Sequence, residues 1–224
     1  MAGDYEALKN KQADLIRKAN DGSVFLGAVT VDPITTLTID SVSNPGTPEL
    51  NTLPEGMDDL GWLTGDGAQF SRDVSTSEVT SWGSVSPTRT DITSDTTTLT
   101  VTAQETKLLT LGLATGADLA AITADATTGE VSIAKPARPK SKHYRALSLA
   151  VDEGDGGEIY VARFLPRAKV TNYAEQAFGS GDDPILWGVT FTGEEDSDLG
   201  YSERWLFGGP GWLALLGKMG ITQA

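Results

Sequence analysis

The side chains that could do chemistry are few in this chain, and their spacing matches no catalytic pattern. The chain has one histidine, His143, and no cysteine. His143 has no serine or carboxylate partner nearby in the sequence, so we predict an ordinary surface residue rather than a general base. Gly179-Ser180-Gly181 lacks the first spacer of the G-x-S-x-G nucleophile elbow. Gly211–Met219 is spaced too widely for a phosphate loop and places Met219 where serine or threonine must reach magnesium, so the sequence predicts no enzyme.

Carboxylates dominate the ionisable groups and give a formal net charge of -14. The acidic runs Asp152–Glu158 and Glu194–Asp198 lack the alternating oxygen ligands and closing glutamate of a calcium-binding loop, so we predict surface turns with no metal or cofactor. A surface this acidic repels phosphate backbones, which argues against sequence-specific DNA binding. The sequence contains no apolar run long enough to span a bilayer and no signal-peptide core, so we expect a soluble protein without a membrane partner. The lack of cysteine is compatible with a reducing cytoplasm.

The elements that would position any site are mainly strands. Along Leu99–Ala103, apolar residues alternate with threonines, which is the period of a half-buried strand. We expect the Ser- and Thr-rich run Trp82–Ile92 to precede it as a strand, with a turn at Ser94-Asp95. Leucines at helical spacing follow Gln104, and Gly116 ends this predicted helix. The sequence therefore predicts a strand, turn, strand and helix over residues 79–116.

The rest of the chain reads as a mainly β (α+β) fold, β-sandwich-like or barrel-like, with an N-terminal helix, a flanking helix and a long loop. We divide it into an N-terminal helix or arm (1–22), a strand with a long Pro-rich loop (23–59), a β-rich core (60–209) and a C-terminal segment (210–224). Helices are predicted at 1–20 and 212–219, and 118–126 extends the flanking helix. Further strands are predicted at 23–31, 35–39, 60–64, 69–74, 130–134, 144–151, 159–165, 168–177, 184–192 and 201–207. Of these, we expect 201–207 to pair with 184–192, and the acidic loop 152–158 to be exposed and longer than a two-residue turn.

One basic stretch stands out in this acidic chain, and it consists of Lys135, Arg138, Lys140, Lys142 and Arg145. It is compatible with a solvated loop, with docking on an acidic neighbouring copy, or with nucleic acid. The five tryptophans lie in or beside the predicted strands, where core and interface packing is the usual role, and a sugar-binding platform is the alternative.

Four short motifs carry a resemblance to a known family. They are DLGW…DG at 59–67, SWG at 81–83, PTRTDITS at 87–94 and TAQET at 102–106, the last leading into the leucine-rich helix. On these residues the segment 53–116, and more loosely the chain to Gly209, resembles the major tail (tail tube) proteins of long-tailed non-contractile bacteriophages. It is most similar to those of phages that infect actinobacteria.

This resemblance implies a structural protein of the virion, assembled in the host cytoplasm. It implies hexameric rings that stack into a tube around a tape measure protein, together with tail tip and tail terminator proteins. DNA would later pass through the lumen without specific binding. The long loop 32–59 and the N-terminal arm would reach adjacent rings, and the extra immunoglobulin-like domain of some relatives should be missing.

An acidic lumen suits this function, because DNA would adhere to a basic wall. As lumen-facing candidates we select acids at or near predicted hairpin turns: Asp91, Asp95, Asp152, Glu153 and Asp155. As inter-ring contacts we select the basic stretch of Lys135, Arg138, Lys140, Lys142 and Arg145. Two other functions stay open, a carbohydrate-binding β domain and an acidic hydrolase that would need two carboxylates converging in a pocket.

Overall fold

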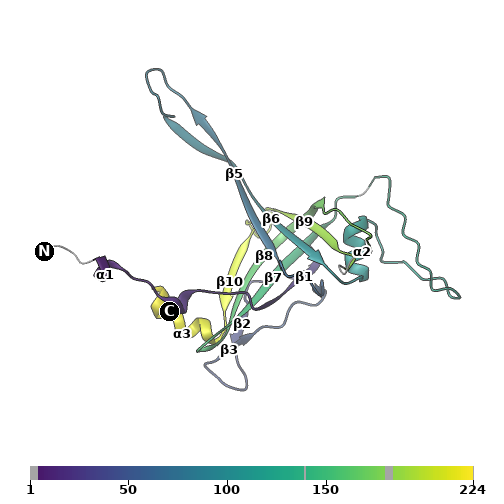
Figure 1. Ribbon diagram of the computed structural model, residues 1–224, viewed down its shortest axis with the longest axis horizontal. Helices are drawn as coiled ribbons and strands as arrows, with labels where there is room; N and C mark the ends of the chain where they lie inside the picture. The colour runs from purple at the N-terminus through teal and green to yellow at the C-terminus, as the bar shows by residue number, and fades with distance from the viewer. Residues whose placement is uncertain (1–4, 139, 180–183, 224) are drawn as a thin grey trace.

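The computed structural model describes residues 5–138, 140–179 and 184–223 (Figure 1). It is 41% strand and 11% helix, which confirms the mainly β fold class. The first 103 residues contain α1 (Tyr5–Leu8), η1 (Ala13–Leu15), β1 (Asp21–Ala28), β2 (Thr38–Asp40), β3 (Pro48–Leu50), β4 (Asp58–Asp59), β5 (Gln69–Val79) and β6 (Arg89–Ala103). They are followed by α2 (Leu108–Thr115), β7 (His143–Gly154), β8 (Gly157–Tyr173), β9 (Trp187–Glu194), β10 (Arg204–Gly208) and α3 (Pro210–Met219).

One antiparallel sheet organises the chain, in the order β4-β1-β7-β8-β9-β6-β5, with β10 also paired to β8. The long strand β8 pairs with β7 along one edge and with two different strands along the other edge. Its first half pairs with β10, and its second half pairs with β9. Between the halves the β7–β8 register shifts opposite Arg145, where Pro166 is fully buried. Proline cannot donate a ladder hydrogen bond and is tolerated at such a bulge, which bends the strand.

Apolar side chains are buried on both faces of this bent sheet. The first cluster joins β1, β7 and β8 to β6, β9 and α2, and it contains Val24, Leu26, Leu60, Leu99, Val101, Ala103, Leu113, Ala146, Leu165, Ala168, Val189 and Phe191. The second cluster lies on the opposite face and contains Ile34, Leu37, Leu147, Leu149, Tyr160, Ala162 and Phe164. Each large side chain fully buried in this way contributes roughly 1.5–3 kcal/mol to stability.

The long loop 32–59 lies mostly against its own sheet, since Ile34 and Leu37 are buried in the second cluster and Leu53 packs against it. The loop contains the short β2–β3 hairpin and ends in β4, which pairs with β1. The loop therefore stabilises its own subunit, and its longest exposed run, 42–46, lies at the β2–β3 turn.

The predicted alternation at 99–103 is confirmed, with Leu99, Val101 and Ala103 buried and the intervening threonines half-buried. The predicted helix is also present as α2, and Gly116 ends it in the left-handed region at φ 65°. The predicted turn at Ser94-Asp95 is wrong. β6 runs straight through these residues, and the chain reverses at 80–88 instead, where Gly83 has φ 86°. Trp82-Gly83 and Pro87 favour a turn more strongly than Ser94-Asp95 does. Ser94 is held in the strand by pairing with Ser75 on β5, and Asp95 is held there by its ion pair with Arg72.

The predicted N-terminal helix is wrong for most of its length. Residues 1–4 lie outside the described part of the chain, α1 is one turn, and Gln12 and Ile16 are extended on either side of η1. An extended backbone leaves the Lys18 N–H free to donate to Asp152, whereas a helix would have used it internally. The segment 9–20 is therefore an arm.

Three further expectations at 60–64, 118–126 and 130–134 differ from the structure. Segment 60–64 makes only an isolated bridge, Leu63 to Ala103, on the edge of β6 that β5 also uses. Segment 118–126 is not helical, because the Asp125 side chain accepts hydrogen bonds from the N–H groups of Thr127 and Thr128 and fixes a turn. Residues 130–134 form no strand and are mostly exposed.

Two predicted connections are also wrong. The strands β7 and β8 continue through the acidic run to a two-residue turn at Asp155-Gly156, because Gly157 with φ 104° permits the tight reversal. The strand β10 pairs with β8 rather than with β9, because β9 lies between β8 and β6 and has no free edge. The predicted C-terminal helix is confirmed as α3.

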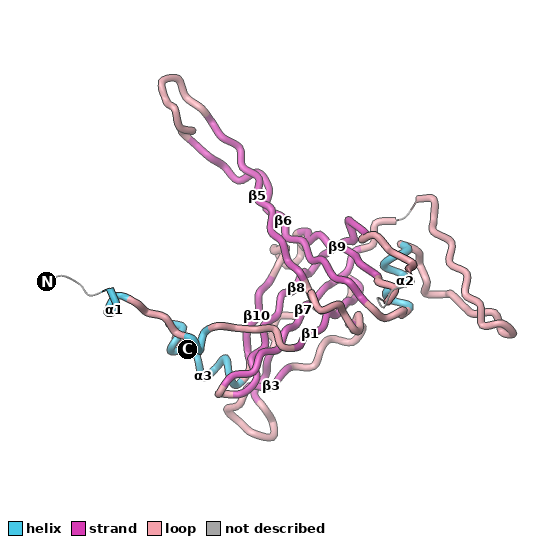
Figure 2. The backbone as a smooth tube through the Cα atoms, viewed as in Figure 1, coloured by secondary structure: helices cyan, strands magenta, loops and turns pink. Residues whose placement is uncertain are grey.

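Three segments project from the body (Figure 2). The β5–β6 hairpin extends as a long arm, in which every residue from 71 to 95 is exposed. The loop between α2 and β7 projects on another side, and the N-terminal arm leaves the body beside α3.

Candidate assembly surfaces

The predicted lumen residues Asp91 and Asp95 both lie on β6 in the projecting hairpin, and each is paired with an arginine. Asp91 accepts from Arg89 Nε at 2.7 Å. Asp95 accepts two hydrogen bonds from Arg72 on the partner strand, and these lower the pKa of Asp95 below its ordinary value. The shaft of the hairpin is therefore less acidic than its aspartates suggest.

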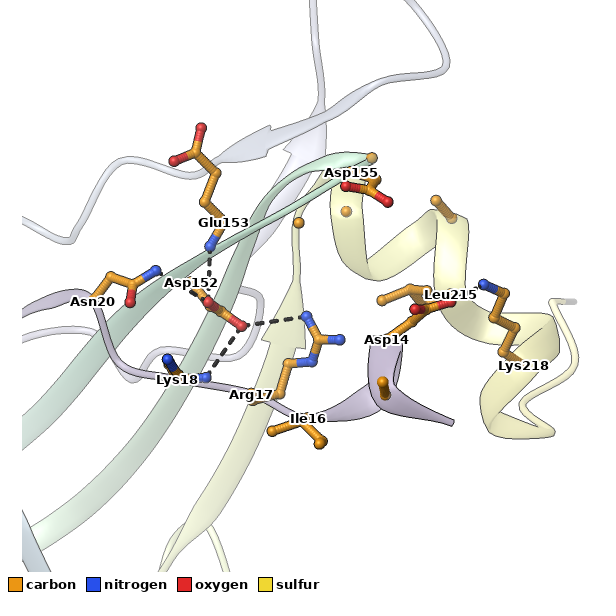
Figure 3. Close-up of a pocket in the computed structure, with 15 residues that line it drawn as sticks. Asp14, Ile16, Arg17, Lys18, Asn20, Asp152, Glu153, Asp155, Leu215 and Lys218 are labelled. Atoms are coloured by element: carbon orange, nitrogen blue, oxygen red, sulfur yellow. Dashed lines mark hydrogen bonds and ion pairs between the residues drawn. The ribbon is translucent and has the colours of Figure 1, made fainter. Parts of the chain in front are cut away.

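The predicted lumen residue Asp152 is buried, with 6% of its surface exposed, so the expectation that it faces a lumen is wrong. It anchors the N-terminal arm (Figure 3). Its carboxylate accepts from Arg17 Nη1, from the Lys18 N–H and from Asn20 Nδ2, each at 3.2 Å. Charge-assisted bonds of this kind are about twice as strong as neutral ones. Sequence spacing could not reveal the contact, because 132 or more residues separate Asp152 from its partners.

Glu153 and Asp155 remain exposed at the β7–β8 turn, as predicted. They line a cavity of about 680 Å³ between this turn, the arm and α3 (Figure 3). On the far side of the cavity, Lys218 of α3 donates to Asp14 of the arm, and this hydrogen bond lowers the pKa of Asp14. The five predicted lumen residues thus fall into two separate groups, two in the hairpin and three beside the arm.

The basic stretch is divided by the fold. Lys135, Arg138, Lys140 and Lys142 are exposed in the projecting loop, where Lys142 Nζ lies 5.3 Å from the Tyr144 ring centroid. Arg145 belongs to β7 and is 8% exposed, so its selection as an inter-ring contact is wrong. The bulge in β8 turns its side chain inward, where Nε donates to the Val29 carbonyl at 3.1 Å.

His143 is not the isolated surface residue that the sequence suggested. Its Nε2 lies 3.0 Å from Glu194 Oε2. Lys169 and Arg167 pair with the same carboxylate, and the hydrogen bond from Lys169, with a smaller contribution from His143, lowers the pKa of Glu194. Only the alignment of β7, β8 and β9 brings these side chains together, so no short-range signal could have predicted the cluster.

Of the acidic run 194–198, Glu194 ends β9 rather than lying in a turn, and the residues after it form the predicted turn, with Asp196 accepting from the N–H groups of Asp198 and Leu199. Across residues 5–138, 140–179 and 184–223, no group of three or more His, Asp or Glu side chains is placed to hold a metal ion. Gly179-Ser180-Gly181 lies partly outside the described residues. Within those residues, no helix is long and apolar enough to cross a membrane.

Comparison with known proteins gives one family. The model described as phage tail tube protein matches residues 9–206. No curated protein matches the chain. Among solved structures, similar chains occur in the baseplate of the anti-feeding prophage (TM-score 0.39, 10% identity, 84% of this chain and 92% of that chain) and in the virion of a native gene transfer agent (0.31, 10%, 68% and 89%). A third is the crystal structure of an Hcp protein (0.30, 12%, 84% and 98%). At these identities and TM-scores the likeness is distant, and the family assignment rests on the family model.

Proposed function

We propose that this chain, which belongs to the phage tail tube protein family, forms hexameric rings that stack into a tube through which DNA is delivered to the host. The family gives it a structural, non-enzymatic role in the phage tail. The hexameric ring, the passage of DNA and the assembly of the tube around a tape measure protein in the host cytoplasm belong to the proposal. The same holds for contacts with tail tip and tail terminator proteins.

The projecting β5–β6 hairpin carries this proposal. All residues from 71 to 95 are exposed, and within the described chain residues 89–97 of β6 have β5 as their only strand partner. An isolated two-stranded hairpin is marginally stable in water. Packing on another copy would stabilise such an arm, which supports assembly of the subunit into a larger structure.

The open edges of the sheet support a closed ring. The sheet ends in β4 on one side and β5 on the other, and β10 has β8 as its only strand partner among the described residues. Unprotected edges invite uncontrolled pairing, whereas head-to-tail contacts that close by rotation use them in a ring. The same logic along the axis gives a stack of rings.

The charge of the chain is compatible with DNA passage. A net charge of -14 repels a phosphate backbone, so DNA would move through the lumen without adhering to its wall. Of the predicted lumen residues, Glu153 and Asp155 are exposed and unmatched by an ion pair of the described chain, so we retain them as the lumen candidates.

The exposed part of the basic stretch is the proposed inter-ring contact. Lys135, Arg138, Lys140 and Lys142 project from an acidic protein on one loop, and opposite charge on the next ring would attract them. The triple variant Arg138→Glu, Lys140→Glu and Lys142→Glu should keep its melting temperature, since these side chains are exposed, but should stop at single rings.

Negative-stain electron microscopy and solution mass test the whole proposal. Rings or tubes with a central hole are the expected result for the wild type, and a monomer at high concentration that tail extracts cannot seed would contradict it. Tubes of normal length from the triple variant would contradict the role of the basic loop alone. A charge-preserving variant, Arg138→Lys with Lys140→Arg and Lys142→Arg, is the control and should form tubes of normal length.

A further inference from the structure

Four aromatic side chains and Arg163 form one continuous row, from the root of the β5–β6 hairpin to α3. The Arg163 guanidinium lies over two rings, 3.7 Å from the Phe70 centroid and 4.1 Å from the Trp205 centroid. Trp205 stacks on Phe207 at 6.2 Å, and Phe207 stacks on Trp212 at 4.7 Å, both nearly parallel. We call these five residues (Phe70, Arg163, Trp205, Phe207 and Trp212) the aromatic row.

The centre of the aromatic row is exposed, and its one charged side chain is held by a hydrogen bond to Glu203. Trp205 is 53% exposed and Phe207 is 42% exposed, although both belong to a sheet strand. Glu203 accepts a hydrogen bond from Arg163 and a second from Thr97 Oγ1 at 3.0 Å, so the one charge in the row is neutralised and fixed in place. Large aromatic side chains that are held in place before binding are typical anchors of protein interfaces.

The tip of the β5–β6 hairpin is the complementary surface in this chain. Residues 79–88 carry no ionisable side chain in a chain of net charge -14. Trp82 and Val85 at this tip are fully exposed. The two other projections carry charge, basic in the loop before β7 and mixed in the N-terminal arm. The tip is therefore the projecting segment that can approach an acidic copy without charge repulsion and bury an apolar anchor.

The tip cannot reach the aromatic row of its own chain. The row begins at Phe70, at the root of the hairpin, and Val79 lies nine positions further along β5. At about 3.3 Å per residue, the tip lies roughly 30 Å from the start of the row. Figure 1 shows the hairpin directed away from the body, so any partner of the tip belongs to a second molecule.

We propose that the hairpin tip of one copy, with Trp82 and Val85 as anchors, packs on the aromatic row of a second copy of this chain. This inference rests on the self-assembly proposed above and identifies the surfaces that perform it. The two surfaces differ from each other, so the contact runs head to tail and propagates into a ring or a stack rather than ending in a dimer.

Because the natural chain contains no cysteine, a disulfide between two introduced cysteines tests this contact directly. Ser84→Cys places a thiol at the tip. Val161→Cys places one within the row, since Val161 pairs with Phe207 across β8 and β10. Equal amounts of the two single variants are mixed under reducing conditions, assembled and oxidised. We expect a covalent pair of chains joined through residues 84 and 161, at least tenfold more abundant than in the control mixture of Ser132→Cys with Val161→Cys.

Trp82→Ser provides the second measurement, with Trp62→Ser as the matched control at another exposed tryptophan. Trp82→Ser should raise the protein concentration needed for assembly at least tenfold, whereas Trp62→Ser should leave it within twofold. Tubes that form normally without a link between residues 84 and 161 would overturn the inference and leave the proposed function standing. A wild-type chain that never assembles, with or without a seed, would overturn the proposed function itself. A disulfide between residues 132 and 161 of equal abundance would also overturn the inference, because it would place the basic loop of the second copy, rather than the hairpin tip, on the aromatic row.

Discussion

The junction between α3 and the β7–β8 turn gives the sharpest stability prediction, because two glycines of one helix respond in opposite directions. At Gly211 the helix begins against the turn. A Cβ added there would lie 2.3 Å from the Gly157 carbonyl oxygen and 2.7 Å from Ile159 Cγ1. The first of these atoms belongs to the backbone and cannot rotate away. At Gly217, two turns later, an added Cβ meets nothing within 4 Å.

Gly211→Ala should destabilise the protein, and Gly217→Ala should stabilise it. Overpacking of this severity costs about 1–3 kcal/mol or more. Alanine in a helix interior gains about 0.5–1 kcal/mol over glycine, which offsets only part of that cost at position 211. In a chain of this size, 1 kcal/mol corresponds to about 2–4 °C in melting temperature. We therefore expect Gly211→Ala to melt several degrees below the wild type, and Gly217→Ala to melt a few degrees above it.

Differential scanning calorimetry of the unassembled subunit measures both changes, with hydrogen exchange of α3 as the local readout. Gly211→Ala should also speed exchange in α3, since the helix must move off the turn to admit the methyl group. Equal melting temperatures for the two variants would refute the reasoning, because helix propensity alone would then dominate and the close approach at Gly211 would not exist in solution.

Two further changes test polar contacts. Asp152→Ala removes the acceptor of three hydrogen bonds from the arm, so it should lower the free energy of unfolding by about 1–3 kcal/mol and release the arm. Faster hydrogen exchange of the Lys18 amide would report the release. The exposed change Glu153→Ala is the control. The hydrogen bond from Lys169 holds the pKa of Glu194 below 4.5 in the folded protein, so its stabilising effect is present above about pH 4.5 and is lost as pH falls through the folded pKa. Glu194→Gln should therefore flatten the fall in melting temperature below about pH 4.5, and an unchanged acid limb would contradict this.

The parts of the fold that follow from the sequence are those with a buried face. The alternation at 99–103 and the run that became β9 record burial of one face at period two. The continuous apolar runs that became β7 and β8 record burial of both faces. The hairpin is different. Its residues 71–95 face water on both sides, so their order carries no burial period, and the turn had to be inferred from weak local preferences.

The errors at single residues share one cause, which is contact over a long sequence distance. Arg145 is buried only because the bulge beside Pro166 directs it toward Val29. Asp152 is buried only because an arm more than a hundred residues earlier crosses it. Both residues stand in hydrophilic stretches, and charged side chains in such stretches are exposed unless paired. A reading of neighbours along the chain therefore favours the surface for both.

The distribution of paired charge gives the fold a physical basis for directed self-assembly. In the folded body, cations sit beside carboxylates: Arg17 with Asp152, Arg163 with Glu203, and Lys169 with Glu194. These pairs leave the excess of acid on the surface, where copies of the chain repel one another. The neutral tip at 79–88 and the basic loop before β7 are the projecting segments that escape this repulsion, one by lacking charge and the other by reversing it. Repulsion between the other surfaces then favours one specific arrangement of the copies, because it weakens every contact between copies except those made through these two segments.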